Sequence, residues 1–190
     1  MSFYTGTQTE ELYSLPTAVT KNTYTTQAIL SATSTQPRAI VPAGFFGPVP
    51  NGKGRSLLLK AMGTVANTAA ATLAVALCFN PTPGTIANAN TIWPATAPTA
   101  ATTTLWMIEA WYTCTTEGGQ SGAIQCNAKI EFSNVASGSA TTSIICAYTQ
   151  FAMSSLNFES QNEVAIAGTW SASSASNTTT VQQMFLFGLN

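Results

Sequence analysis

The sequence predicts an all-β fold, an antiparallel β-sandwich or jelly roll of roughly eight strands with an extended N-terminal arm. Apolar and polar residues alternate with a period of two in nearly every apolar segment, as in strands with one buried face. Long amphipathic helical patterns are missing, and turn-forming residues recur at regular spacing. The 190 residues, of which 45% are hydrophobic, suffice for one domain with a real core. We therefore expect an arm over residues 1–37 and a sandwich domain over residues 38–190.

The predicted arm is polar and rich in threonine, and its apolar residues are isolated rather than periodic. Two interpretations stay open, an extended arm that can add an edge strand and a disordered tail. Isolated anchors suit docking onto another subunit. The candidate partner-interface residues are Phe3, Tyr4, Leu12, Tyr13 and Leu15.

The rest of the chain predicts the strands of the sandwich. We expect residues 55–65 and 72–79 to form an antiparallel pair, and residues 162–172 and 178–189 to form a terminal hairpin. Residues 80–99, rich in Pro, Asn and Thr, predict a long surface loop. The other predicted strands are residues 39–46, the two arms of a hairpin over residues 106–132, and residues 139–151.

The hairpin over residues 106–132 is close to a mirror image about Gln120. In this register Cys114 faces Cys126, and Glu109 faces Glu131. Alternation along the strands then separates an apolar face from a polar one. The apolar face collects Ile108, Ala110, Tyr112, Cys114, Cys126, Ala128, Ile130 and Phe132, and the polar face collects Glu109, Trp111, Thr113, Asn127, Lys129 and Glu131.

The cysteine pair has two interpretations, a cross-strand disulfide and two free buried thiols. Free thiols are favoured, because cysteine behaves as a small hydrophobe and the N-terminus shows no secretory pattern. A zinc site would require C-x2-C pairs, which this sequence lacks. We expect no metal and no cofactor.

Catalysis is disfavoured by the residue types that are missing. The chain has neither histidine nor aspartate, which excludes Ser-His-Asp triads, Cys-His pairs and histidine metal ligands. Opposed Glu109 and Glu131, about 5 Å apart, would suit a retaining glycosidase. Lys129, two residues from Glu131 on the same face, offers a simple ion pair instead. We therefore expect no enzymatic activity and no catalytic residues.

The charge distribution limits the partners. Charged residues make up only 7% of the chain, against about 25% in typical soluble domains. The weak electrostatic repulsion between copies favours a protein that is part of an assembly. The longest apolar run, Leu73 to Phe79, is too short for a membrane span. We expect neither a nucleic-acid partner nor a membrane partner, because the basic residues form no cluster. They are Lys21, Arg38, Lys53, Arg55, Lys60 and Lys129.

The order of segments resembles a family of small structural proteins of tailed bacteriophages. The resemblance covers about residues 50 to 190. It is carried by a Gly/Lys/Arg turn with two apolar strands (GKGRSLLLKAMGTVANTAAATLAVALCFN), a Trp-bearing strand (LWMIEAWYTC), and the closing AGTWSASSASNTTTVQQMFLFGLN.

This resemblance implies a non-enzymatic jelly-roll protein that decorates or cements a capsid. The implied partners are the major capsid protein and copies of the chain itself, as a homotrimer, and the implied location is the capsid surface of a virion assembled in the host cytoplasm. The alternative function is a tail- or head-associated module that binds a host surface glycan or receptor. Trp93, in the predicted loop over residues 80–99, is its candidate contact.

Overall fold

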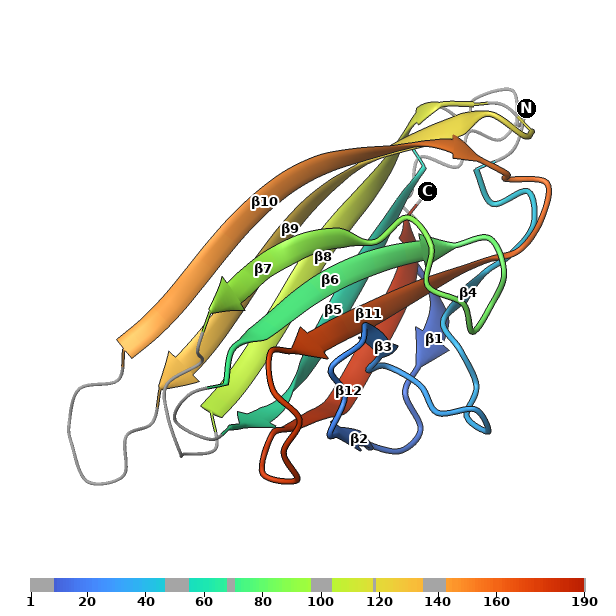
Figure 1. The fold of residues 1–190 in the computed structure, drawn as a ribbon. Coiled ribbons are helices and arrows are strands. Elements are labelled where there is room, and N and C mark those ends of the chain that lie inside the picture. The colour runs from blue at the N-terminus through green and yellow to red at the C-terminus, as the bar shows by residue number, and fades with distance from the viewer. Residues whose placement is uncertain are drawn as a thin grey trace, which may run out of the picture.

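The computed structural model describes residues 9–46, 55–67, 71–96, 104–117, 119–134 and 143–189, and its regular elements there are all β-strands. They form two packed antiparallel sheets (Figure 1). The all-β sandwich is therefore confirmed, with twelve strands in the described residues instead of roughly eight. The strands are β1 (Thr9–Ser14), β2 (Val19–Asn22), β3 (Ala28–Ile29), β4 (Ile40–Val41), β5 (Ser56–Ala66), β6 (Leu73–Asn80), β7 (Asn90–Thr96), β8 (Thr104–Thr116), β9 (Gly122–Asn134), β10 (Ser143–Leu156), β11 (Asn162–Trp170) and β12 (Thr178–Leu189).

The strands pair in the nested order of a jelly roll. The larger sheet runs β1-β12-β5-β8-β9-β10, with β2 also on β12, and the smaller sheet runs β3-β11-β6-β7, with β4 also on β11. β1 and β2 thus pair with the last strand β12, β3 and β4 pair with β11, β5 pairs with β8, and β6 pairs with β7. The hairpin of β9 and β10 follows β8 and widens the larger sheet.

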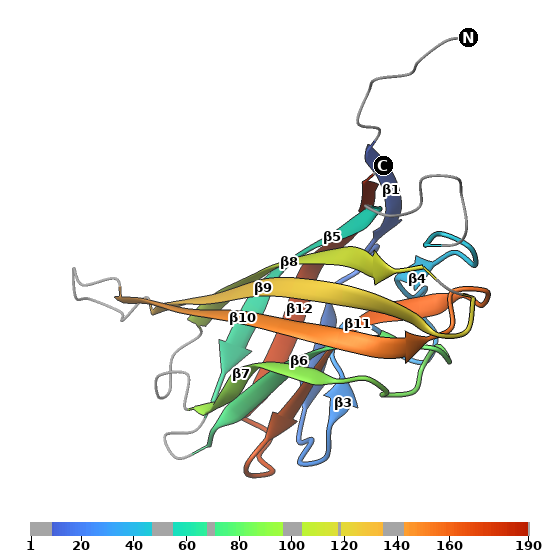
Figure 2. The ribbon, with the colours of Figure 1, turned by 90° about the horizontal axis from the view of Figure 1, so that it is seen from above.

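Two predicted pairings are wrong because of this nesting. β5 and β6 lie in different sheets, where β5 pairs with β12 and β8, and β6 pairs with β11 and β7. β11 and β12 likewise belong to opposite sheets and form no hairpin. Between β11 and β12, the polar turn over residues 171–177 carries the chain across the sandwich instead of back along the same sheet. Figure 2 shows the described loop that leads from β11 to β12 at the end of the sandwich.

The predicted surface loop over residues 80–99 is also wrong in part. β7 occupies its second half and closes the edge of the smaller sheet beside β6. Trp93 is only 5% exposed and packs on Phe132 of the larger sheet, with 4.6 Å between the ring centroids. A contact between Trp93 and an external glycan is therefore excluded by its burial.

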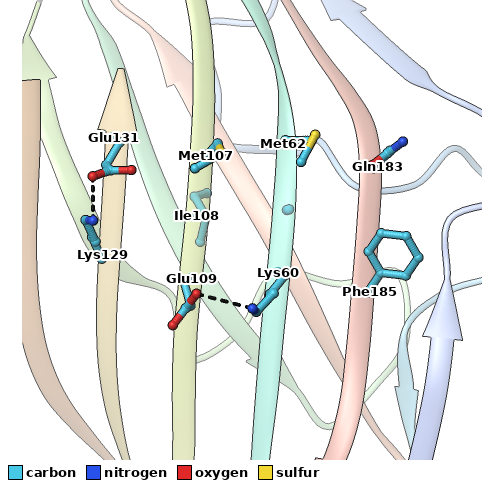
Figure 3. A pocket seen from close by; sticks show the side chains of 10 residues that line it. Lys60, Met62, Met107, Ile108, Glu109, Lys129, Glu131, Gln183 and Phe185 are labelled. Carbon is cyan, nitrogen blue, oxygen red and sulfur yellow. Dashed lines mark ion pairs between the residues drawn. The ribbon is translucent and has the colours of Figure 1, made fainter. Parts of the chain in front are cut away.

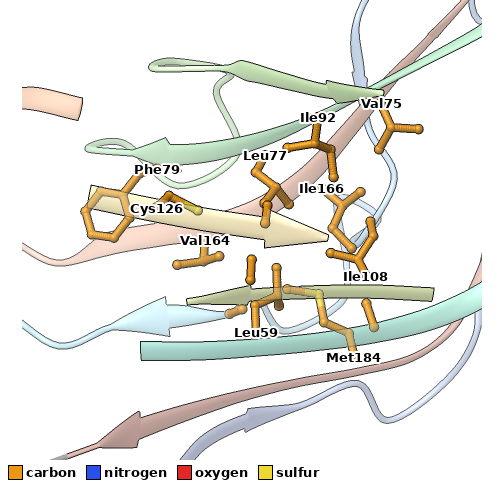
Figure 4. Packing of buried hydrophobic residues seen from close by; sticks show 14 of the residues in the cluster. Leu59, Val75, Leu77, Phe79, Ile92, Ile108, Cys126, Val164, Ile166 and Met184 are labelled. Carbon is orange, nitrogen blue, oxygen red and sulfur yellow. The ribbon is translucent and has the colours of Figure 1, made fainter. Parts of the chain in front are cut away.

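The core lies between the two sheets, as the alternation predicts. Leu57, Leu59 and Ala61 of β5 point into it, and so do Leu77 and Phe79 of β6. Figure 4 shows residues of both sheets interdigitating there. The predicted apolar face of the 106–132 hairpin is buried throughout, which confirms that assignment of faces.

The segment predicted as an arm joins both sheets from Thr9 onward. β1 and β2 both pair with β12, and β3 pairs with β11. Tyr13 belongs to the core and donates a hydrogen bond to the Pro37 carbonyl at 3.1 Å, while Leu12 and Leu15 pack against the same core. These three residues therefore find their contacts within their own chain. Phe3 and Tyr4 lie outside the described residues.

An ion pair between a buried carboxylate and a partly buried guanidinium holds the end of the smaller sheet together. Glu163, at the start of β11, is 1% exposed and accepts hydrogen bonds from Arg38 at 2.9 Å and from the Gly84 amide at 2.7 Å. Gly84 has a φ of +87°, and a Cβ there would come within 3.2 Å of the Arg38 guanidinium. The contact fixes the loop between β6 and β7, and both carboxylate oxygens of Glu163 accept a hydrogen bond.

Candidate functional site

The outer face of the larger sheet is the candidate functional surface. Within the described residues, all the exposed large hydrophobic side chains lie on it, from strands β5, β8 and β10. Scattered single apolar residues are normal on a protein surface, but their collection on one face is typical of a contact surface. The five residues are Met62, Leu105, Met107, Trp111 and Tyr148.

Strand register places a row of charges across the middle of this face. Lys60 on β5 lies beside Glu109 on β8, which lies beside Lys129 on β9. The Lys60 Nζ is 3.6 Å from a Glu109 carboxylate oxygen, and Lys129 forms an ion pair with Glu131. We call Lys60, Glu109 and Lys129 the charged row. It divides the outer face into two parts.

The predicted opposition of Glu109 and Glu131 is wrong by two residues. Glu109 faces Lys129, and Glu131 faces Met107. The hydrogen bond from Lys129 lowers the pKa of Glu131 and raises the pKa of Lys129, so both groups keep their charges at neutral pH. Each carboxylate is held by a lysine, so the two do not face each other as an acid and a nucleophile would. The lack of enzymatic activity stays a prediction.

One side of the charged row is apolar. Met62 and Met107 lie side by side on β5 and β8, with Leu105 two residues further along β8. Met62 and Met107 line a hollow of about 280 Å³ together with the charged side chains of Lys60, Glu109, Lys129 and Glu131, and Gln183 and Phe185 of β12 border it on the far side (Figure 3). We call Met62, Leu105 and Met107 the methionine end.

The other side of the charged row carries aromatic rings and amides. Trp111 on β8, Asn127 on β9 and Gln150 on β10 lie side by side across three strands. Tyr148 stands beside Lys129 on β10 and is 76% exposed. These side chains line an open hollow of about 380 Å³. We call Trp111, Asn127, Tyr148 and Gln150 the aromatic end.

The cysteines do not contribute a paired site. Cys126 faces Tyr112, and Cys114 faces Ile124, so the predicted direct opposition of the two cysteines is wrong. All four cysteines are free in the structure. Burial raises the pKa of Cys78 and of Cys126 to about 12, and that of Cys114 is raised as well, so these thiols stay protonated. Cys146 lies exposed on the outer face and donates a hydrogen bond to Glu131 at 3.3 Å.

The part of the chain that the structure describes holds no cluster of three or more potential metal ligands. In that same part, no helix has the length and apolarity to cross a membrane. Sequence reasoning placed Trp111, Lys129 and the two glutamates on the outer face, but it missed the methionine end. The available signal was that Met62, Leu105 and Met107 occupy positions that the alternation assigns to the solvent side of their strands.

Comparison with known proteins gives weak likenesses only. No protein-family model matches the sequence, and no curated protein is similar to it. Among solved structures, the chain is similar to the CBM2 module of the evolved Dit of Lactobacillus casei BL23 phage J-1, with 9% identity, a TM-score of 0.33 and 97% of each chain covered. It is also similar to the structure of infectious bursal disease virus, Gx strain, with 11% identity, a TM-score of 0.34, and 96% of this chain and 41% of that chain covered. At such TM-scores the likeness assigns neither a family nor an activity.

Proposed function

We propose that this protein is a non-enzymatic structural component of a tailed-phage virion, one that binds the capsid lattice and stabilises it as a decoration or cement protein. The observation that carries the proposal is the collection of exposed apolar side chains on the outer face of the larger sheet. An apolar patch rimmed by polar groups is typical of lasting contact between proteins. The sequence resemblance to phage structural proteins and the low charge of the chain agree with this role.

The methionine end is the contact surface in this proposal. Methionine side chains are long and unbranched, so they adapt to a partner surface without demanding hydrogen bonds. The charged row forms one rim of that surface, since its ion pairs remain partly exposed and satisfied. The partner that packs on it is a capsid subunit or another copy of the chain within a homotrimer.

The segment before β1 is the second attachment in this proposal. β1 and β2 hold the chain on β12 from Thr9 onward, and the proposed attachment is the sequence that precedes Thr9. Phe3 and Tyr4 remain the proposed anchors on a neighbouring subunit. In this proposal the two aromatic side chains bury apolar area on the neighbouring subunit.

A charge placed in the methionine end tests the contact surface. Met107→Lys puts an ammonium group where the proposal requires a dry apolar contact, because Met107 lies between Met62 and Glu131. We expect at least a tenfold loss of binding to shells of the encoding phage in co-sedimentation, or loss of the trimer in sedimentation velocity. Ser121→Lys, an equal change of charge in the exposed turn after β8, is the control and should change neither measurement.

The outcome against the proposal is equally definite. If Met107→Lys keeps both the oligomeric state and the shell binding of the wild-type protein, the methionine end is not the contact surface. If immunogold labelling leaves purified virions unmarked, the virion role itself is wrong.

A further inference from the structure

We propose that the aromatic end of the outer face is a carbohydrate-binding site for a short run of neutral sugar residues. The site consists of Trp111, Asn127, Tyr148 and Gln150, on strands β8, β9 and β10. It lies across the charged row from the methionine end, and it does not depend on the proposed virion role. Sugars combine apolar C–H faces with rings of hydroxyl groups, so a sugar site needs aromatic faces beside hydrogen-bonding side chains.

Charged side chains contact both aromatic rings, and the Trp111 ring is oriented by a hydrogen bond. The indole N–H of Trp111 donates to Glu109 at 3.1 Å, and this bond limits rotation of the exposed ring. The Lys129 ammonium lies 5.7 Å from the centroid of the Tyr148 ring. Lys129 is itself held by Glu131. The Trp111 ring is therefore preorganised by Glu109, which lowers the entropic cost of binding.

The spacing of the rings suits an oligosaccharide. Trp111 and Tyr148 lie two strands apart, so their backbones are separated by roughly 10 Å across the sheet, with a further offset of two residues along it. A single sugar residue cannot contact both aromatic rings, but a chain of two or more sugar residues can. The surface between them, on β9, is formed by the polar side chains of Asn127 and Lys129.

Two side-chain amides lie beside the rings with unused hydrogen-bonding groups. Asn127 and Gln150 lie side by side on β9 and β10, next to Trp111 in the same row. Within the described residues, neither amide has a protein hydrogen-bond partner, and both are exposed. Each amide offers two N–H donors and a carbonyl acceptor, the combination that pairs with sugar hydroxyls.

The electrostatics of the site favour an uncharged ligand. The two lysines and two glutamates around the site form the pairs Lys60–Glu109 and Lys129–Glu131. Among the described residues around the site, neither lysine is left unpaired to bind a sulfate, a phosphate or a carboxylate. An anionic sugar would have to break one of these ion pairs, so a neutral sugar is the better match.

The test uses purified full-length protein and a panel of neutral oligosaccharides: maltohexaose, cellohexaose, galactohexaose and chitohexaose. Trp111 is 42% exposed whereas Trp93, Trp106 and Trp170 are buried, so sugar stacking changes the emission of one indole. We expect saturable binding of at least one member, seen by fluorescence and by calorimetry. Trp111→Ala should weaken it at least tenfold, Trp111→Phe should restore part of the loss, and Tyr148→Ala should also weaken it.

Controls make each result decisive. Tyr148 is mostly exposed, so its truncation leaves the fold intact, and circular dichroism confirms this for every variant. Ser121→Ala, in the exposed turn after β8, should bind like the wild type. The proposal fails if no neutral sugar binds, or if Trp111→Ala binds as tightly as the wild type. It also fails if only heparin binds and 0.5 M salt abolishes the binding, since a neutral-sugar contact is insensitive to salt.

Discussion

Among single residues, the cysteines make the most direct prediction. Cys78, Cys114 and Cys126 are buried with raised pKa values, while Cys146 is exposed on the outer face. We expect a thiol-specific reagent at pH 8 to modify one cysteine in the native protein and four after unfolding under non-reducing conditions. Modification of Cys146 should be slow, because partial desolvation and the Glu131 carboxylate raise its pKa. Two thiols after unfolding, with a mapped bridge between Cys114 and Cys126, would contradict the prediction.

The 106–132 hairpin shows how far residue patterns reach. Alternation correctly predicted which side chains face the core, because a slip by one residue would mix the two faces. A slip by two residues keeps the faces unmixed, so hydrophobicity cannot distinguish the mirror about Gln120 from the observed register. The register therefore depends on the turn between the strands, and the observed pairing has a bulge between Cys114 and Thr116. That slip gives Glu109 a lysine as its neighbour in place of a glutamate.

At the scale of elements, the N-terminal segment divides at Thr9. Deleting residues 2–8 should leave stability nearly unchanged in urea unfolding, because β1 and its contacts remain, while shell binding should fall. Deleting residues 2–22 removes β1 and β2 with the buried Tyr13 and Val19. At about 1.5–3 kcal/mol for each buried side chain, we expect a loss of roughly 3–6 kcal/mol. Equal stability of the two truncated proteins would show that β1 and β2 contribute little to the fold.

The elements that the sequence did not reveal are short or irregular. β1, β2 and β3 have two to six residues, too few for a period to emerge, and Leu12 and Tyr13 of β1 have the sequence pattern of isolated anchors. β7 contains Pro94, which is unusual in a strand, so its sequence has the composition of a loop. Its pairing with β6 is also irregular, with two register shifts. All four of these strands lie at sheet edges, where tertiary pairing overrides weak local preference.

For the whole molecule, the decisive fact is the nested pairing of β1 and β2 with β12. The sequence predicted the long strands β5, β6 and β8 to β12 but assigned two connections to hairpins, since a polar turn has the same composition whether the chain returns along one sheet or crosses to the other. The strand order of the larger sheet also determines the methionine end and the aromatic end. Both combine residues of strands that only this order makes neighbours, among β5, β8, β9 and β10.

The same nesting predicts slow folding. The first strands can pair only when the last strand is in place, so most stabilising contacts join distant parts of the chain. We expect refolding on the order of milliseconds to seconds, followed by stopped-flow tryptophan fluorescence after dilution from urea. Completion within microseconds would indicate that local contacts dominate the transition state instead.

The pairing of Thr9 with Leu189 brings the two ends of the described chain to the same corner of the sandwich (Figure 2). Any domain or affinity tag fused after β12 therefore stands next to the segment proposed to anchor the protein, and it competes with the shell for the same space. The exposed turn at Ser121, between β8 and β9, is a better place to insert a label. Reagents built at that turn would report on binding without obstructing it, and the neighbouring ends would allow a circularly permuted chain with a short linker.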